Sequence, residues 1–312
     1  MLISKLTTFQ NKGKVKTLVC IKSLETLVQL IRKLSENKKS PELTKQKKRQ
    51  NDAEKNDKDS VIDDPVINNA ETFLMIGKGS NSLIDPNSET VFIRLEGNLS
   101  QCYLSENSII AFAGCTISKL LRYCVKHKIN GFDFMAGVPA SIGGMTFMNF
   151  GCWGESMSQI IEEVQYMDRQ GNLYWEKVNK LSFGYRKSIF QTKPWIITAV
   201  KMRYEKAKSS KEVQDKIDQR IKQRLDHQPI SAKTFGSIFK NHEKIKAAKL
   251  IEEMRTKLNL FKTVKISQKH ANFMENIDSA SYQEVTDLIH QIKELANKKH
   301  QVNLECEVRF LS

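Results

Sequence analysis

The sequence predicts an α+β protein in which a strand-rich part and a helix-rich part follow one another along the chain. Short apolar runs separated by glycine turns dominate the first two thirds of the 312 residues, whereas amphipathic helices fill most of the last third. We therefore expect two units that meet near residue 206, namely residues 1–205 and 206–312. Hydrophobic residues make up 40% of the chain and include 15 Phe and 3 Trp, which supports a proper core.

The spacing of apolar residues predicts each element in turn. The first helix begins at Ser23, which can cap it, and Leu27, Leu30, Ile31 and Leu34 share one face. Residues 36–69 are polar and rich in lysine, so they cannot bury enough surface to offset the entropy of ordering, and we expect a flexible insertion without a function of its own. The other expected elements are strands at 73–76, 91–95, 109–113, 164–167, 195–204 and 304–311, helices at 116–128, 212–227, 244–254 and 281–298, and an irregular buried loop at 136–154.

Composition excludes several classes of function. The net charge of +15 invites a nucleic-acid interpretation, but residues 32–58 alone supply ten Lys/Arg against five Asp/Glu, and the remainder forms no basic stripe with aromatic residues between. We therefore expect no nucleic-acid partner, and a basic protein would also attract a small anionic ligand such as a nucleotide sugar. No run of about 18 apolar residues occurs, and the first residues are polar, so we expect a cytoplasmic protein with no membrane partner.

Cysteines and histidines are too scattered to predict a metal site. The six cysteines form no C-x-x-C pair, and the six histidines form no closely spaced pair. We expect neither a disulfide framework nor a bound metal.

Two glycine-rich stretches are candidates for binding a cofactor. Residues 76–82 follow an expected strand, and their glycines allow a turn whose N–H groups can approach an anion, with Ser80 and Asn81 as further donors. An ordinary turn explains this stretch equally well. Residues 137–151 combine glycines and apolar side chains with few polar groups, which suits either a large planar cofactor or a tight structural crossover.

Three further stretches carry candidate polar residues. Arg186 follows an aromatic–glycine turn and could clamp a carboxylate or phosphate, or lie on the surface. Ser237 follows a glycine between bulky apolar residues, where a hydroxyl needs a partner or a role, and the G-x-S-x-G signature of an acyl-enzyme is absent. Glu307 and Arg309 alternate on one face of the expected last strand, where a surface ion pair is the simplest interpretation.

Taken together and in this order, these stretches resemble the UDP-N-acetylenolpyruvoylglucosamine reductase family of bacterial wall synthesis. The strongest matches are Gly-x-Gly-Ser-Asn at 77–81 and Gly-Val-Pro-Ala-Ser-Ile-Gly-Gly at 137–144. The series continues with Met-Asn-Phe-Gly at 148–151, Phe-Gly-Tyr-Arg at 183–186, Gly-Ser-Ile-Phe-Lys-Asn at 236–241, Lys-Leu-Ile-Glu-Glu at 249–253, Lys-His-Ala-Asn-Phe at 269–273 and Glu-Val-Arg at 307–309. The short connection after Arg186 is similar to the second type of this family, which lacks an extra loop over the substrate.

The resemblance implies a fold and a set of roles. The fold is an FAD-binding unit of two α+β subdomains, of the vanillyl-alcohol-oxidase (PCMH) type, followed by a C-terminal α+β substrate-binding domain. The implied catalytic residues are Ser237, Arg186 and Glu307, and Asn241, His270 and Arg309 would contact the sugar nucleotide or its carboxylate. The implied FAD-binding residues are Gly77, Lys78, Gly79, Ser80, Asn81, Gly137, Pro139, Ala140, Ser141, Gly143, Gly144, Asn149 and Gly151.

The implied reaction uses FAD and NADPH to reduce UDP-N-acetylglucosamine enolpyruvate to UDP-N-acetylmuramate, with the proton at C2 coming from Ser237. Arg186 would stabilise the developing enediolate, and we expect Glu307 to be protonated or held by Arg or water. The chain departs from the family at 7–13, where a basic residue and one glycine are missing, and at Lys78, Trp153 and Cys306. A monomer is expected, although the sequence leaves the oligomeric state open.

Two other interpretations stay open at this point. One is a different FAD oxidoreductase of the same fold, with flavin tethered covalently, for which Cys152 in the second glycine-rich stretch is the candidate. The other is a basic binding protein without enzymatic activity, which would be colourless and would bind nucleic acid in a salt-sensitive way.

Overall fold

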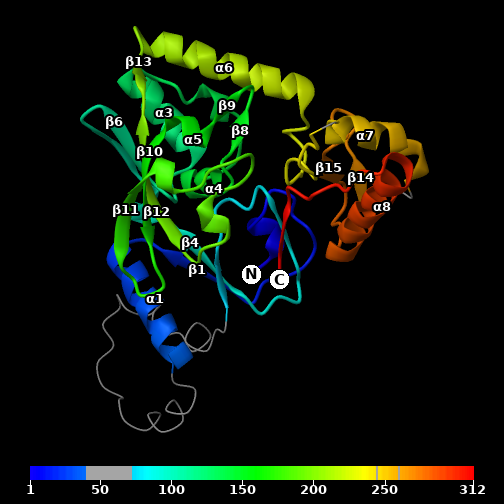
Figure 1. The fold of residues 1–312 in the computed structure, drawn as a ribbon, viewed down its shortest axis with the longest axis horizontal. Coiled ribbons are helices and arrows are strands. Elements are labelled where there is room, and N and C mark those ends of the chain that lie inside the picture. The colour runs from blue at the N-terminus through cyan, green and yellow to red at the C-terminus, as the bar shows by residue number, and fades with distance from the viewer. Residues whose placement is uncertain (40–71, 244, 259–260) are drawn as a thin grey trace.

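The computed structural model describes residues 1–39, 72–243, 245–258 and 261–312. Sheets and helices are mixed throughout, which confirms the α+β class (Figure 1). The buried hydrophobic side chains form one large cluster, a second cluster that contains most of the C-terminal helices, and a small third one near both ends of the chain.

A parallel three-stranded sheet opens the fold, in the order β1-β4-β2. It consists of β1 (Thr17–Ile21), β2 (Phe73–Met75) and β4 (Val91–Leu95). Helix α1 (Leu24–Lys39) presents Leu27, Leu30 and Ile31 to the main cluster, as its spacing predicts. The helix runs four residues into the segment that we expected to be a flexible insertion, so that expectation is wrong for 36–39. The remainder of the expected insertion, 40–69, lies outside the described residues.

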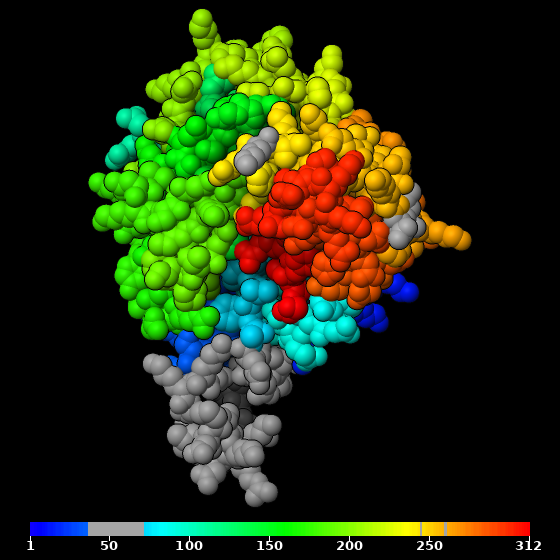
Figure 2. Space-filling model, turned by 45° about the vertical axis from the view of Figure 1, so that its right-hand side comes forward, coloured from blue at the N-terminus to red at the C-terminus, as the bar shows by residue number. Residues whose placement is uncertain are grey.

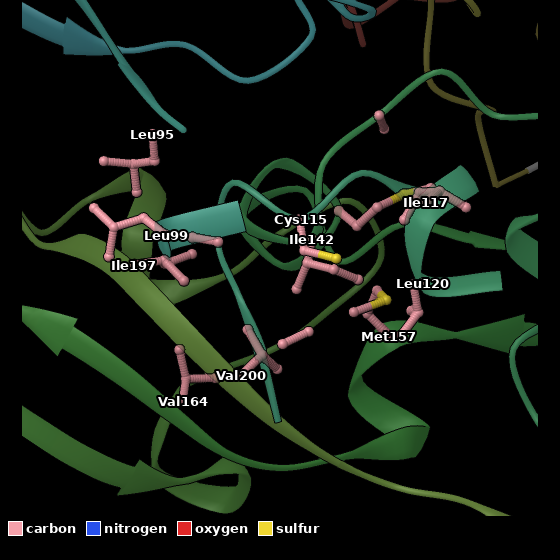
Figure 3. Close-up of a cluster of buried hydrophobic side chains, with 14 of the residues drawn as sticks. Leu95, Leu99, Cys115, Ile117, Leu120, Ile142, Met157, Val164, Ile197 and Val200 are labelled. Atoms are coloured by element: carbon pink, nitrogen blue, oxygen red, sulfur yellow. The ribbon is translucent and has the colours of Figure 1, made fainter. Parts of the chain in front are cut away.

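A five-stranded antiparallel sheet forms the centre of the first part of the chain, in the order β11-β10-β12-β6-β5. Figure 3 shows Val164 and Val200 packed side by side from neighbouring strands of this sheet, and Cys115 next to Ile142 in the same core. The strands are β5 (Cys102–Ser105), β6 (Ser108–Phe112), β10 (Ile161–Met167), β11 (Leu173–Lys177) and β12 (Ile196–Arg203). The predicted strands at 109–113, 164–167 and 195–204 are therefore confirmed.

Helices and short elements surround this sheet. Helix α3 (Ile117–His127) begins where Thr116 caps it, since the Thr116 side chain accepts from the Lys119 N–H. The short elements are η1 (Ile3–Lys5), β3 (Ser82–Ile84), η3 (Gly97–Ser100), β7 (Ile129–Asn130), η4 (Asp133–Met135), β8 (Gly151–Cys152), β9 (Glu155–Ser156), α5 (Met157–Ile160), η5 (Val178–Lys180), η6 (Ile189–Gln191) and β13 (Glu205–Lys206).

The glycine-rich stretch 136–154 is more regular than we expected. Helix α4 (Ile142–Phe147) lies in its middle, where we predicted an irregular loop. The Ser141 side chain accepts from the Gly144 N–H and caps the helix, and Ile142 and Met145 bury their side chains. A local cap and tertiary packing thus outweigh the low helix propensity of two consecutive glycines.

The last third is helical, as predicted. Helices α7 (Ala247–Met254) and α8 (Tyr282–His300) pack with the hairpin of β14 (Val264–Ile266) and β15 (Met274–Asn276), whereas helix α6 (Ser210–His227) packs on α3. The predicted capping box of α8 is present: Ser281 and Glu284 satisfy each other's backbone N–H groups. Helix α6 extends across the first part of the molecule and leads to the separate body of α7 and α8 (Figure 1).

The final strand is shorter than the sequence indicates. Only β16 (Arg309–Leu311) is a strand, and it pairs in parallel with β3. Residues before it bond to the stretch that follows α6 instead: the N–H groups of Glu307 and Val308 both point to the Ile238 carbonyl. This irregularity breaks the simple alternation on which a strand over 304–311 depended. Figure 2 shows the chain's last residues lying between the first part of the molecule and the C-terminal helices.

Candidate active site

Two glycine turns from distant parts of the sequence face each other. A Cβ added to Gly77 would lie 2.4 Å from the Ser141 Oγ, at the start of α4. Gly79 has φ +61°, and a Cβ there would lie 2.4 Å from the Leu6 carbonyl oxygen. Only glycine permits both the backbone conformation and this close approach. The turns at 77–81 and 137–144 therefore lie against each other and form a glycine cradle, which fits a pyrophosphate-containing cofactor such as FAD.

An arginine that we did not single out from the sequence supports this cradle by donating hydrogen bonds to backbone carbonyls. The Arg94 Nε donates to the Gly77 carbonyl at 3.0 Å, and its Nη2 donates to the Leu6 carbonyl at 3.2 Å. Arg94 lies on β4 within an ordinary-looking apolar strand, so its only signal in the sequence was a charge in a run of buried residues. Lys78 is exposed and Ser80 is partly buried at the rim of the turn.

The rest of the expected FAD-binding stretch is held by its own side chains and by helix α6. Asn149 adopts φ +42°, and its side chain donates to the Gly184 carbonyl at 2.8 Å and accepts from the Ser158 N–H at 3.0 Å. Gly137 and Gly151 are also crowded, by the Arg224 side chain and by the Glu155 carbonyl. Of the other expected residues, Ala140 is buried, Gly143 packs on Ala113, and Pro139 and Gly144 are exposed.

A largely buried ion pair joins two sequence-distant candidates. The Arg186 Nε lies 2.6 Å from the Glu307 Oε1, and the two side chains are only 15% and 14% exposed. Arg186 adopts φ +54°, which a residue with a side chain holds only when its surroundings impose it. Burial raises the pKa of the Glu307 carboxyl, and Arg186 and then Lys240 offset part of that rise. The structure thus brings Arg186 and Glu307 together, and Glu307 does not pair with Arg309 on a surface strand, as the simplest interpretation had it.

The same pair is connected directly to the first glycine turn. The Asn81 side chain donates to the Glu307 carbonyl at 2.9 Å, and the Arg309 N–H donates to the Asn81 carbonyl at 3.0 Å. Two hydrogen bonds consequently join the turn that fits a pyrophosphate to the segment that carries Glu307 and Arg309.

Arg309 offers a second cation at this place. Its Cζ lies 4.6 Å from the centroid of the Phe147 ring, at the end of α4. Among the described residues it has no carboxylate partner, and burial lowers its pKa. A half-buried guanidinium on an aromatic ring, without an acid beside it, is suited to receive an anionic ligand.

The candidate serine lies on the other side of the cradle. Gly236 has φ +81°, and a Cβ there would lie 3.8 Å from the Ser80 carbonyl oxygen, so the backbone before Ser237 passes close to the first glycine turn. Ser237 is partly buried and pairs as an isolated bridge with Phe273. Its hydroxyl makes no hydrogen bond with any residue that the structure describes, which leaves it free for a ligand.

Asn241 and His270 differ in how closely they join this group. The Asn241 N–H donates to the Tyr185 hydroxyl at 3.3 Å, and Tyr185 also lies against Arg186. The rings of His270 and Phe273 pack edge to face, with their centroids 4.8 Å apart. Phe273 in turn pairs with Ser237, so it links His270 to the candidate serine. The His270 Nδ1 is buried without a partner, and burial lowers its pKa, with His227 adding to the effect.

The surroundings of the cysteines and of other possible metal ligands can be described for the same residues. The described residues contain no group of His, Cys, Asp and Glu that could hold a metal ion, and all six cysteines are free thiols. The Cys152 Sγ donates to the Phe134 carbonyl at 3.0 Å, and burial raises its pKa, which makes it a poor nucleophile. No helix in the described part of the chain is long and apolar enough to cross a membrane.

Comparison with known proteins now gives the class and then the family. Residues 67–176 match the FAD binding domain family model, and residues 228–311 match the model for the C-terminal domain of UDP-N-acetylenolpyruvoylglucosamine reductase. With the glycine cradle described above, these matches define a flavin-linked oxidoreductase. The chain belongs to the UDP-N-acetylenolpyruvoylglucosamine reductase family.

Curated relatives support this assignment over most of the chain. The UDP-N-acetylenolpyruvoylglucosamine reductase of Clostridioides difficile is 32% identical over 240 residues, which cover 77% of this chain and 79% of the relative. That of Halalkalibacterium halodurans is 33% identical over 239 residues, covering 76% and 79%. The crystal structure of the enzyme from Thermus caldophilus superposes with a TM-score of 0.76 at 23% identity and covers 100% of this chain and 98% of its own, which confirms the fold.

Proposed function

We propose that this protein reduces UDP-N-acetylglucosamine enolpyruvate to UDP-N-acetylmuramate in peptidoglycan synthesis, using FAD and NADPH. The observation that carries the proposal is the connection of the buried Arg186–Glu307 pair, through Asn81, to the glycine cradle. Such a connection supports the proposal, because charged groups that can act on a carboxylate substrate would then lie beside the cofactor. The relatives' shared name supplies the substrate class.

FAD would be held by the residues of the two glycine turns, 77–81 and 137–144, with Asn149 and Gly151. When bound, FAD would supply the redox chemistry, namely hydride transfer from NADPH and, through N5, to C3 of the enolpyruvyl group. We assign this binding to residues 1–205 and substrate binding mainly to residues 206–312, in the cytoplasm and without nucleic acid or membrane.

The protein's own side chains would manage the charge that develops on the substrate. Hydride addition at C3 leaves negative charge at C2, which spreads into the carboxylate as an enediolate. Arg186 would stabilise this charge, an effect of about 3–4 kcal/mol for a preorganised donor in a dry site. Arg309, which has no carboxylate partner among the described residues, would hold the substrate's carboxylate, and Asn241 and His270 would contact the sugar nucleotide.

Ser237 would donate the proton to C2. Its hydroxyl has no hydrogen-bond partner within the described residues, which supports the proposal because the hydroxyl would be free to donate to the basic enediolate. Glu307 would not act as a bare carboxylate next to growing negative charge, because Arg186 holds it and burial favours its neutral form.

A visible spectrum of the purified protein tests the proposal. We expect a yellow protein that bleaches with NADPH in the absence of oxygen and regains its colour when UDP-N-acetylglucosamine enolpyruvate is added. Flavin that only oxygen restores would indicate a different flavoenzyme, and flavin retained after denaturation would indicate covalent attachment at a residue such as Cys152. A protein that stays colourless after addition of FAD would contradict the proposal.

A further inference from the structure

One amide side chain bonds to the backbone that supports both cations of the candidate site, Arg186 and Arg309. Gln191 ends the short helix η6, and its Nε2 donates to the Arg186 carbonyl at 3.1 Å and to the Phe147 carbonyl at 2.9 Å. A primary amide has two N–H groups, and these face the two carbonyls and a weak third acceptor, the Met148 Sδ at 3.8 Å. Nothing in the sequence motifs points to Gln191, which lies five residues beyond Arg186.

The first of these bonds acts on a strained residue. Arg186 is in the left-handed region at φ +54°, inside a tight turn closed by two hydrogen bonds between Gly184 and Lys187, at 3.0 and 3.1 Å. A side chain that adopts this conformation needs external support. The Gln191 amide supplies it at the carbonyl of Arg186 itself, while the guanidinium of Arg186 is aimed at Glu307.

The second bond acts on Phe147, whose aromatic ring lies against the guanidinium of Arg309. The Phe147 carbonyl accepts from Gln191 and also from the Ser188 hydroxyl at 2.6 Å, and the Phe147 ring lies 4.6 Å from the Cζ of Arg309. Two donors on one carbonyl oxygen fix the end of helix α4 and hence the ring. Gln191 therefore joins the backbone of Arg186 to the support of Arg309.

We propose that Gln191 is a positioning residue that sets the separation of the Arg186 and Arg309 guanidinium groups, so that one carboxylate-bearing substrate can contact both. The inference rests on the proposed function and adds the residue that keeps the two guanidinium groups at a fixed separation. Like charges repel, so two cations that serve one substrate each need a partner that holds the backbone or the supporting ring in place. An amide does this without adding a charge of its own.

The test replaces Gln191 with Met, which keeps the length of the side chain and removes both donors. The matched control is Gln214→Met, because the Gln214 side chain is exposed on α6 and, among the described residues, donates to Asp218 alone. For each variant we would measure the melting temperature, FAD affinity, the rate of flavin reduction by NADPH, the rate of flavin reoxidation by enolpyruvyl substrate, and the dissociation constant for UDP-N-acetylmuramate by calorimetry.

Gln191→Met should slow reoxidation about tenfold and weaken binding of the carboxylate-bearing product by a similar factor, as expected for lost alignment of two charge-bearing donors. FAD affinity and the NADPH step should stay within about twofold of the control. Should Gln191→Met fail to fold, Gln191→Asn, which keeps the amide on a shorter side chain, should show the same selective loss.

Two results would overturn the inference. Unchanged reoxidation and product binding would show that Gln191 does not align the cations. An equal loss in both half-reactions and in FAD affinity would show a purely structural role. A wild-type protein that the enolpyruvyl substrate cannot reoxidise would instead contradict the proposed function, so the two failures are distinguishable.

Discussion

At the scale of single residues, two site candidates adopt backbone conformations that side chains normally avoid. Asn149 and Arg186 have φ values of +42° and +54°, and they are neighbours in space because the Asn149 amide bonds to the Gly184 carbonyl. Strain of this kind costs about 1–3 kcal/mol per residue and persists where the surroundings enforce it. Both strained residues lie at the contact between Asn149 and the turn that contains Arg186. This agrees with a site whose geometry is maintained at the expense of stability.

The role of Ser237 can be tested by separating the two half-reactions. Ser237→Ala removes a hydroxyl that has no protein partner among the described residues, so the fold should lose little. We expect NADPH to reduce the flavin at the wild-type rate, whereas reoxidation by enolpyruvyl substrate should fall about 100- to 10,000-fold, the usual loss for a missing general acid. Stopped-flow absorbance under nitrogen measures both rates, and an equal loss in the two would make Ser237 a structural residue.

Glu307 gives the site a pH dependence of definite sign. Its pKa is raised by burial, so the neutral form persists to higher pH than in an exposed glutamate and is lost as pH rises through the raised pKa. Because the ionised form adds negative charge beside the developing enediolate, reoxidation should slow as pH rises through this range. Glu307→Gln cannot ionise and should show a flat profile there. A wild-type rate that rises with pH in the same range would assign activity to the ionised form.

At the scale of elements, the first glycine turn is constrained from two sides. Gly79 combines φ +61° with a backbone carbonyl 2.4 Å from the place of a Cβ, whereas Gly131 has φ +98° and open space around it. Gly79→Ala should therefore lower both the melting temperature and the affinity for FAD. Gly131→Ala should cost only the backbone strain of about 1 kcal/mol and leave FAD affinity unchanged. Calorimetry and flavin titration of the two variants check this, and an equal loss of FAD affinity in both would contradict it.

The sequence predicted long elements well and short ones poorly. The spacing over 281–298 and the Ser281–Glu284 box identified α8, since both signals are local. By contrast β3 and β5, with three and four residues, were missed. The partner of β3 is β16, far along the chain, whereas β5 pairs with the neighbouring β6 but shows no alternation of buried and exposed side chains. The strand at 304–311 was overextended because two successive N–H groups share the Ile238 carbonyl, which no pattern of apolar residues reveals.

The sequence identified most candidate residues of the site, but it did not reveal which of them contact one another. Arg186 and Glu307 stand out as motif members, yet their pairing joins positions 121 residues apart. Gln191 and Arg94 act through backbone carbonyls, so their roles depend on tertiary placement and leave no signature in the sequence. Such supporting contacts are visible only once the fold is known.

At the scale of the whole molecule, the beginning of the chain is tied to the C-terminal part. The Thr8 hydroxyl donates to the Thr234 carbonyl at 2.7 Å, and the Asn276 amide donates to the carbonyls of Phe9 and Gln10 at 2.9 and 3.0 Å. Phe9 packs in the hydrophobic cluster of α7 and α8. The stretch 7–13, which departs from the family pattern, therefore has a clear role in joining distant parts of the chain.

This junction can be weakened without touching the site. Asn276→Ala removes two donors and the acceptor that caps the Ala280 N–H, and the side chain is buried. At about 1 kcal/mol for each lost bond, the free energy of unfolding should fall by about 2–3 kcal/mol. Urea unfolding measures the change, with the exposed Asn297→Ala as control, since Asn297 makes one side-chain bond, to Asn303. A loss equal to that of the control would show that the junction carries little energy.

The hydrogen bond between Asn81 and Glu307 also has a consequence for the time during synthesis at which the chain should first bind flavin. It spans 226 residues, so the first glycine turn leaves the ribosome long before the strand that completes it. Contacts of such sequence separation form late in folding, because the intervening chain must first be closed into a loop. Nascent chains should therefore acquire flavin only after residues 307–311 have emerged, and the cofactor would act as a checkpoint for finished molecules.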